Sequence, residues 1–355
     1  APTNVSNFNI SVIGDIATLS WNSVQSAAYY EIRFVPEGVE AVWNSATPLL
    51  PQASGTSAQV ATMVGSYLIK AVRGNGVRSR EATAIQSNVA GVLGLNVVEL
   101  VTQPGFAGRM EKVEKTNGSL RLLSKNVLSN WNALSAISNM TEGLNGEGTN
   151  VELEGIYYFD QMFDLGAVFT SRLTAKIVAE GLDFTNVVSK WQTLTAFSFM
   201  DSTKPEDWGV ELQYRTSNTA ASKDNWTEWR PLIVGDVTAR AFEFRLRLYG
   251  VGQSGNDFST ISPLVHSVAV SIDMPDRVEA QNDILIPASG KLISFSPPFI
   301  ALRGLAVDAQ NLQTGDYKTI NSKDKDGFNI QFFNSNNQPI ARTIDYVAKG
   351  YGVQH

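Results

Sequence analysis

The sequence predicts an all-β protein, and three observations point to this class. Short stretches of alternating apolar and polar residues recur along the chain, and the clearest is ARAFEFRLRLYG at 239–250. Its two sides carry different side chains: Phe242, Phe244, Leu246 and Leu248 on one, and Glu243, Arg245, Arg247 and Tyr249 on the other. Such alternation is typical of a strand with one face in a core. Glycine, proline, asparagine and serine separate the stretches at regular spacing, as in β-sandwiches. A composition of 43% hydrophobic and 17% charged residues is that of a folded protein.

The cysteine and histidine content limits the chemistry available to this chain. There is no cysteine, which excludes disulfides and cysteine-based metal sites or nucleophiles. The two histidines are His266, in an expected strand, and His355, the last residue. Neither is placed as the base that a serine triad needs. We therefore expect a protein that is not an enzyme and that uses no cofactor and no metal ion.

Charge and hydropathy limit the partners. The acidic excess lies wholly in residues 94–275, so no basic face for nucleic acid is expected. The longest apolar stretch, 90–101, is shorter than the about 20 residues of a membrane span, so the chain is not expected to be membrane-embedded. We expect this stretch to pack in a domain seam or against another copy of the chain. The sequence begins at Ala1 with no visible signal peptide, which predicts a processed or partial chain.

Residues 1–93 form the first predicted domain. The segments TLSWN (18–22), YYEIRF (29–34) and SYLIKAVRGNG (66–76) resemble the fibronectin type III pattern. The resemblance implies that Trp21 and Tyr67 are core residues of a sandwich. Domains of this type act as spacers and docking modules, so the fold by itself assigns no activity.

Two further β-domains are predicted. Residues 94–275 contain seven or more strand-like segments with long loops, which favours a jelly-roll-like β-sandwich. Within them, residues 125–140 have apolar side chains at helix-like spacing and predict a short helix or an irregular packed segment. Residues 276–355 predict a small C-terminal β-domain, and its eighty residues bury little core alone. We expect this domain to be completed in an oligomer.

The order of these domains resembles the C-terminal region of bacteriophage tail-tip attachment proteins, the lambda-type host-specificity proteins and central tail fibres. The segments that carry the resemblance are FRLRL (244–248), DMPDR (273–277), GFNIQFFN (327–334) and RTIDYVAKGYG (342–352). The resemblance implies a homotrimer at the tail tip of a virion, assembled in the host cytoplasm. It implies contacts with other tail-tip proteins through an amino-terminal part outside this sequence. It also implies a distal, lectin-like, trimeric last domain that attaches to a protein or glycan receptor on the bacterial surface.

Two other functions are compatible with the same domains. A carbohydrate-binding region of a secreted polysaccharide-active protein also strings fibronectin and jelly-roll modules together, and it predicts a monomer with a sugar cleft. A depolymerase would need two carboxylates across a cleft. The adjacent acids Glu206 and Asp207 rarely face each other on one loop, so the sequence does not favour that chemistry.

The outer face of 239–250 leaves alternatives open. Arg245 and Arg247 suit a phosphate or carboxylate of lipopolysaccharide, because a guanidinium forks onto such groups. Pairing with acids on the sheet face or with another subunit is the more usual role of such arginines, and we expect it here; simple exposure to solvent is the third alternative. Trp208, Trp226 and Trp229 lie near acids, and their rings could stack on sugars. Capping of the sandwich edge is the alternative role for these three tryptophans.

Two loops of the last domain are the candidate receptor contacts. They are NSKDKDG (321–327) and NSNNQP (334–339), which are first of all turn sequences. Loops at the end of a rigid scaffold also carry recognition. The candidate residues are Lys323, Asp324, Lys325, Asp326, Asn334, Asn336, Asn337 and Gln338. The DKDG segment lacks the spaced acids of a calcium loop, so no calcium site is predicted.

Overall fold

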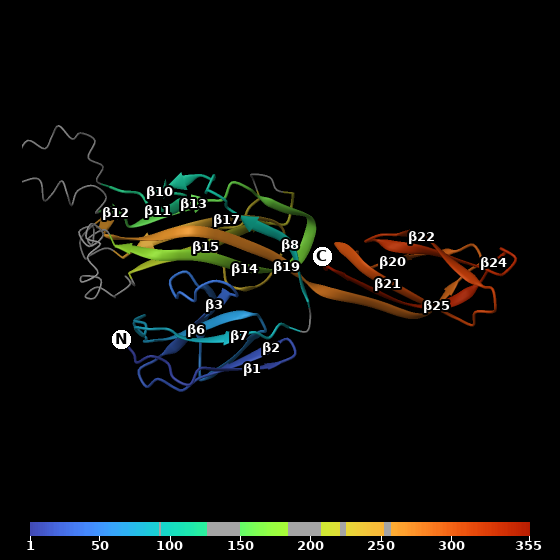
Figure 1. Cartoon of the computed structure of the whole chain (residues 1–355), viewed down its shortest axis with the longest axis horizontal. Coiled ribbons are helices and arrows are strands. Elements are labelled where there is room, and N and C mark those ends of the chain that lie inside the picture. The colour runs from blue at the N-terminus through green and yellow to red at the C-terminus, as the bar shows by residue number, and fades with distance from the viewer. Residues whose placement is uncertain (92–93, 126–149, 184–206, 221–224, 252–256) are drawn as a thin grey trace, which may run out of the picture.

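The computed structural model describes residues 1–91, 94–125, 150–183, 207–220, 225–251 and 257–355. These residues contain strands and connecting segments but no helix, so the all-β class is confirmed. The first sandwich lies alongside a larger middle one, and a third extends from the end of the middle sandwich (Figure 1). Apart from Lys125, the helix-like stretch 125–140 lies outside the described residues.

The first sandwich has the sheet composition of a fibronectin type III-like fold. One sheet holds β1 (Asn9–Ile13), β2 (Ile16–Ser20) and β5 (Ser57–Ala61). The other holds β4 (Thr47–Ala53), β3 (Tyr29–Pro36), β6 (Gly65–Val72) and β7 (Thr83–Ser87). Trp21 is buried with its ring edge-to-face against Tyr30 at 5.2 Å. The buried Tyr67 hydroxyl accepts from the Met63 N–H at 3.0 Å, an arrangement typical of the tyrosine corner of such sandwiches. Both core positions are confirmed.

The middle sandwich is a large antiparallel sheet folded into two layers. One layer contains β9 (Met110–Glu111), β13 (Glu154–Tyr158), β17 (Gly235–Gly250), β15 (Trp208–Ser217) and β16 (Arg230–Pro231). The other contains β8 (Leu95–Thr102), β10 (Val113–Thr116), β11 (Ser119–Leu122) and β19 (Ile261–Ile286). The 21-residue β14 (Phe163–Asp183) pairs first with β17 and then with β19, and so joins the layers. A short ribbon of β12 (Val151–Glu152) and β18 (Phe258–Ser259) lies at one end.

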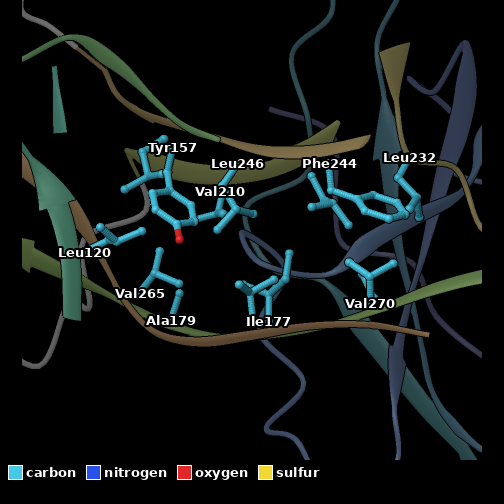
Figure 2. Close-up of a cluster of buried hydrophobic side chains, with 14 of the residues drawn as sticks. Leu120, Tyr157, Ile177, Ala179, Val210, Leu232, Phe244, Leu246, Val265 and Val270 are labelled. Atoms are coloured by element: carbon cyan, nitrogen blue, oxygen red, sulfur yellow. The ribbon is translucent and has the colours of Figure 1, made fainter. Parts of the chain in front are cut away.

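The apolar side of β17 fills the space between these layers. Phe244 and Leu246 are buried opposite Ile177, Val265 and Val270 of the other layer (Figure 2). Burial of each such side chain contributes about 1.5–3 kcal/mol to folding. The alternation in 239–250 is therefore confirmed as one core face and one outer face.

Strand β19 links the second and third sandwiches without a break. It is 26 residues long and pairs with β8 and β14 before residue 276, and with β25 (Arg342–Tyr351) after it. The expected domain boundary at 275/276 thus falls inside one strand. The chain end returns to the middle sandwich, where the His355 N–H donates to the Val168 carbonyl at 2.9 Å. Two connections therefore hold the third sandwich to the second.

The third sandwich packs two small sheets over a phenylalanine-rich core. The sheet of β19 and β25 continues to β21 (Ala301–Gln310). The facing sheet holds β20 (Lys291–Ser294), β23 (Gly327–Phe333), β22 (Tyr317–Lys323) and β24 (Pro339–Ile340). Phe295 and Phe328 lie against the ring of Tyr346, at 6.2 and 5.3 Å.

The first and middle sandwiches share hydrogen bonds and core residues. The Val234 N–H donates to the Pro48 carbonyl at 2.9 Å, and the Val210 N–H donates to the Asn44 carbonyl at 3.1 Å. Val234 belongs to the core of the first sandwich. Of the stretch 90–101, residues 95–101 form most of β8 and pair with β19 in the middle sandwich.

Candidate functional site

Arg247 on the outer face of β17 is held by an acid, as the sequence predicted. Its guanidinium donates two hydrogen bonds of 2.7 Å to the carboxylate oxygens of Glu154 on β13. These bonds lower the pKa of the Glu154 carboxyl from its usual value. A bidentate pair of this kind satisfies both charges. Arg247 is therefore a structural residue of the sheet face.

Arg245, two residues earlier, lies in a different environment. The strand register places it on one rung with Tyr158 of β13 and Gln213 of β15. Its Nε donates to Gln213 Oε1 at 2.7 Å. Its guanidinium carbon lies 4.5 Å from the centre of the Trp229 ring and 5.7 Å from that of Tyr158. Within the described residues, no carboxylate forms an ion pair with Arg245.

Other arginines extend this arrangement along the sheet. Arg215 lies 4.8 Å from the Trp229 ring and 5.3 Å from the Trp226 ring, and Arg109 lies 3.7 Å from the Tyr158 ring. Each contact is within the range of a cation–π interaction. The resulting arginine–aromatic row consists of Trp226, Arg215, Trp229, Arg245, Tyr158 and Arg109.

The structure separates the three tryptophans that the sequence grouped together. Trp226 and Trp229 belong to the row and are half-buried. Trp208 is 5% exposed and belongs to the core of the middle sandwich, so its ring is not open to a sugar. The acid Glu206 lies outside the described residues. Sequence reasoning missed Tyr158 and Arg109, although the alternation beside the buried Tyr157 already puts Tyr158 on an outer face.

The two candidate receptor loops lie at opposite ends of one strand. Lys323 ends β22 and Asp324, Lys325 and Asp326 form the turn before β23, whereas 334–338 follow β23. That strand has seven residues, so about 23 Å of extended chain separates the loops. The two loops therefore lie at opposite ends of the third sandwich.

The turn at 324–326 is close to the middle sandwich. Its Lys325 carbonyl accepts from the Phe299 N–H at 3.0 Å, and Phe299 lies 4.1 Å from the guanidinium of Arg277, where β19 leaves the middle sandwich. Asp324 Oδ1 accepts from the N–H groups of Asp326 and Gly327, at 2.8 and 3.1 Å. This turn is therefore not a tip of the molecule.

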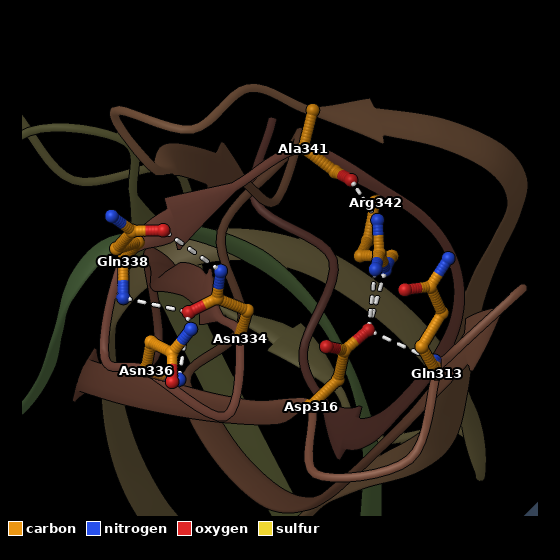
Figure 3. A network of polar contacts seen from close by, with 7 residues as sticks. All are labelled: Gln313, Asp316, Asn334, Asn336, Gln338, Ala341 and Arg342. Carbon is orange, nitrogen blue, oxygen red and sulfur yellow. Dashed lines mark hydrogen bonds and ion pairs between the residues drawn. The ribbon is translucent and has the colours of Figure 1, made fainter.

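The loop at 334–338 lies at the far end, beside β24 (Figure 1). Asn334 Oδ1 accepts from the N–H groups of Asn336 and Gln338, at 3.0 and 2.9 Å (Figure 3). The Asn337 side chain accepts from the Tyr317 hydroxyl at 2.8 Å. These bonds fix the loop, so its outer polar atoms are presented by an ordered turn.

An ion pair strengthens the same end of the third sandwich. Asp316 accepts from the Gln313 N–H at 2.9 Å and pairs with Arg342 (Figure 3). These two groups hold the pKa of the Asp316 carboxyl below its usual value. The Asp316 side chain is 3% exposed. Asp316 therefore ties the turn before β22 to the start of β25 rather than contacting a ligand.

The described residues contain no group of three or more histidine, cysteine, aspartate or glutamate side chains arranged to hold a metal ion. Nor does this part of the chain include a helix long and apolar enough to cross a membrane.

Comparisons with known proteins give little guidance. No protein-family model matches the sequence, and no curated protein matches it. One solved structure that it resembles is a carbohydrate-binding module of the β-sandwich superfamily, with 9% identity, 76% of this chain and 97% of that chain covered, and a TM-score of 0.18. Another is the FN1–FN3 domains of chicken CNTN1, with 9% identity, 99% and 96% coverage, and a TM-score of 0.19. Likenesses this low do not bear on what the chain binds.

Proposed function

We propose that this chain is the attachment segment of a bacteriophage tail-tip fibre and binds a receptor on the bacterial surface without catalysing a reaction. The observation that carries the proposal is the continuous β19. It joins two sandwiches and projects the third, with the ordered loop 334–338 at its far end. A rigid connection suits attachment, because a loop that is already ordered loses less entropy when it binds. The tail-fibre resemblance of the sequence supports the same role.

The proposal includes a homotrimer, joined to other tail-tip proteins through an amino-terminal part of the fibre. Support comes from apolar residues on the outer face of β19 and β25 in the third sandwich. Val278, Leu285 and Val347 are 60%, 61% and 48% exposed there. Exposed apolar side chains gathered on one face are typical of surfaces that bind a partner, and a second and third copy would cover them. Several copies would also bind a surface more tightly than one.

Light scattering tests the oligomeric state. A mass near three times the 38.6 kDa of the chain supports the fibre. A second measurement tests attachment: replacing 334–338 by glycine and serine is expected to preserve the fold and to reduce binding to host cells. Unchanged attachment would exclude that loop from the receptor contact.

A second candidate function is sugar binding in a secreted polysaccharide-active protein. The arginine–aromatic row favours it, because aromatic rings and guanidinium groups are common contacts for sugars and their charged substituents. This function predicts a monomer of 38.6 kDa that binds oligosaccharides in solution. A trimer without measurable sugar binding would contradict it.

A further inference from the structure

Arg245 is fixed in position by its neighbours. Its Nε is hydrogen-bonded to Gln213 Oε1, and the amide nitrogen of Gln213 donates in turn to Glu211. The Trp229 ring lies along one side of the guanidinium, and the Tyr158 ring lies beside it. An arginine held in this way has already lost most of the side-chain entropy that binding an anion would cost.

Within the part of the chain that the structure describes, the charge of Arg245 is not matched by an acid, in contrast to its neighbours. Arg247 pairs with Glu154, Arg215 with Glu243, and Arg109 with Glu111. Among the described residues, the Arg245 guanidinium has one hydrogen bond, from Nε to a neutral amide. Its two terminal nitrogens are therefore free of protein acceptors there. Such a fork fits the two oxygens of a carboxylate or of a phosphate.

The rings beside Arg245 add a surface for a sugar. Trp229 and Tyr158 are half-buried, with their ring centres 6.0 Å apart at an interplanar angle of 73°. Aromatic side chains of this kind present a large apolar surface with little flexibility, and the parts of the two rings that the neighbouring arginines leave uncovered can contact the apolar side of a sugar. A neutral sugar would leave the Arg245 fork unsatisfied, whereas an acidic sugar would use both features.

We propose that Arg245, Trp229 and Tyr158 form a binding site for a saccharide that carries an anionic group. The carboxylate or phosphoryl group binds the Arg245 fork, and the sugar ring packs against the uncovered parts of the two aromatic rings. The inference rests on the proposed function in one respect, because it supplies a ligand class for an attachment protein. The site itself depends only on the geometry of the outer face of β17.

Calorimetric titration of the whole chain tests this site. The probes are a trimer of galacturonic acid, its methyl ester, and glucose 6-phosphate. We expect the free acid, the sugar phosphate or both to bind, and the ester to bind about tenfold more weakly than the acid or not at all. Affinity should fall as salt rises from about 50 to about 500 mM. The two anionic probes distinguish a carboxylate from a phosphate ligand. Equal binding of acid and ester, or no binding of either anion, would overturn the proposal.

Variants locate the binding. Arg245→Gln is expected to weaken binding about tenfold or more, and Arg245→Lys to weaken it less, because lysine keeps the charge but lacks the fork. Arg247→Gln is the matched control, since it removes the same charge from the same strand and face. The affinity of this variant for the anionic probes should stay within about threefold of that of the natural chain. If Arg247→Gln lost as much affinity as Arg245→Gln, the effect would come from the overall charge of the chain, and the proposed site would be overturned.

Attachment to host cells, measured in parallel, separates this inference from the proposed function. Cell attachment without binding of the soluble anions would remove the Arg245 site and leave the attachment proposal standing. If the chain binds the anions but attaches to no host cell, the Arg245 site stands and the attachment proposal is removed.

Discussion

Arg245 and Arg247 lie two positions apart on β17, on the same face, and share the same chemistry. Their environments differ because the neighbouring strand offers Glu154 to Arg247 and Tyr158 to Arg245. A charge next to a carboxylate stabilises the sheet, whereas a charge beside aromatic rings keeps its capacity for an anion. At the scale of the residue, the register of β13 against β17 decides the role of each arginine.

The core tryptophan of the first sandwich gives a direct stability test. Trp21→Ala is expected to lower the free energy of unfolding of that sandwich by about 3–5 kcal/mol, because it leaves a cavity beside Tyr30. Chemical denaturation, with limited proteolysis as the readout of unfolding, measures this loss of free energy. Ile13→Ala is the control, because that side chain is 81% exposed and should change stability by less than about 0.5 kcal/mol. A Trp21 variant as stable as the control would contradict the core assignment.

The carboxyl of Asp316 predicts a pH dependence for the third sandwich. Its folded-state pKa is lowered, first by the Gln313 N–H and then by Arg342. The stability it contributes is therefore present above the unfolded pKa of about 3.9 and is lost as the pH falls through the lower folded value. Asp316→Asn should lower the Tm at neutral pH. The difference in Tm between this variant and the natural chain, the Tm gap, should close below about pH 4. Thermal melts over this range measure the gap, with Asp308→Asn as an exposed control. A gap independent of pH would refute this account.

At the scale of the element, close approach between strands constrains β13. Its Gly155 lies against the backbone of Lys112, and a Cβ built there would stand 2.4 Å from the Lys112 carbonyl oxygen. No side chain fits that space unless one of the two backbone segments moves. β13 carries both Glu154, which pairs with Arg247, and Tyr158, which lies beside Arg245. The close approach that requires glycine at position 155 therefore also positions the partners of these two arginines.

Gly155→Ala should therefore destabilise the middle sandwich by about 1–3 kcal/mol through overpacking. It should also weaken anion binding at Arg245, because Tyr158 lies on the same strand. Denaturant unfolding and the titration above measure the two effects. Gly304→Ala on β21 is the control, since its Cβ would meet nothing within 4 Å. Equal stability of the two variants would show that β13 can shift without cost.

At the scale of the whole molecule, the shared β19 couples the second and third sandwiches. The ladder of β19 with β8 ends at Pro275 and its ladder with β25 begins at Asp276, so bending between them would have to break the hydrogen bond from the Asp276 N–H to the Gly94 carbonyl, 2.9 Å long. The returning chain end adds a second connection at Val168. The loop 334–338 is therefore carried at a fixed place relative to the arginine–aromatic row.

The proposed trimer predicts the effect of a charge on its interface. Val347→Lys places a cation in the middle of the outer face of β25, where burial of an unpaired charge is costly. The mass in solution should fall from three chains to one. Ile13→Lys changes a more exposed apolar residue of the first sandwich, 81% against 48%, and should leave the mass unchanged. A trimer that survives Val347→Lys would place the interface elsewhere.

The sequence by itself determined the fold class and the faces of its strands. Alternation in 239–250 separated core from surface, and the fibronectin-like pattern placed Trp21 and Tyr67 in a core. Both follow from local rules, because side-chain direction along a strand repeats every two residues. Only the tertiary structure decided which outer residues meet. Strand register brought Tyr158 to Arg245, the segment before β16 brought Trp229 there, and burial removed Trp208 from the same surface. It also put the two polar turns at opposite ends of β23, because a strand fixes the distance between its ends while the sequence shows only their spacing.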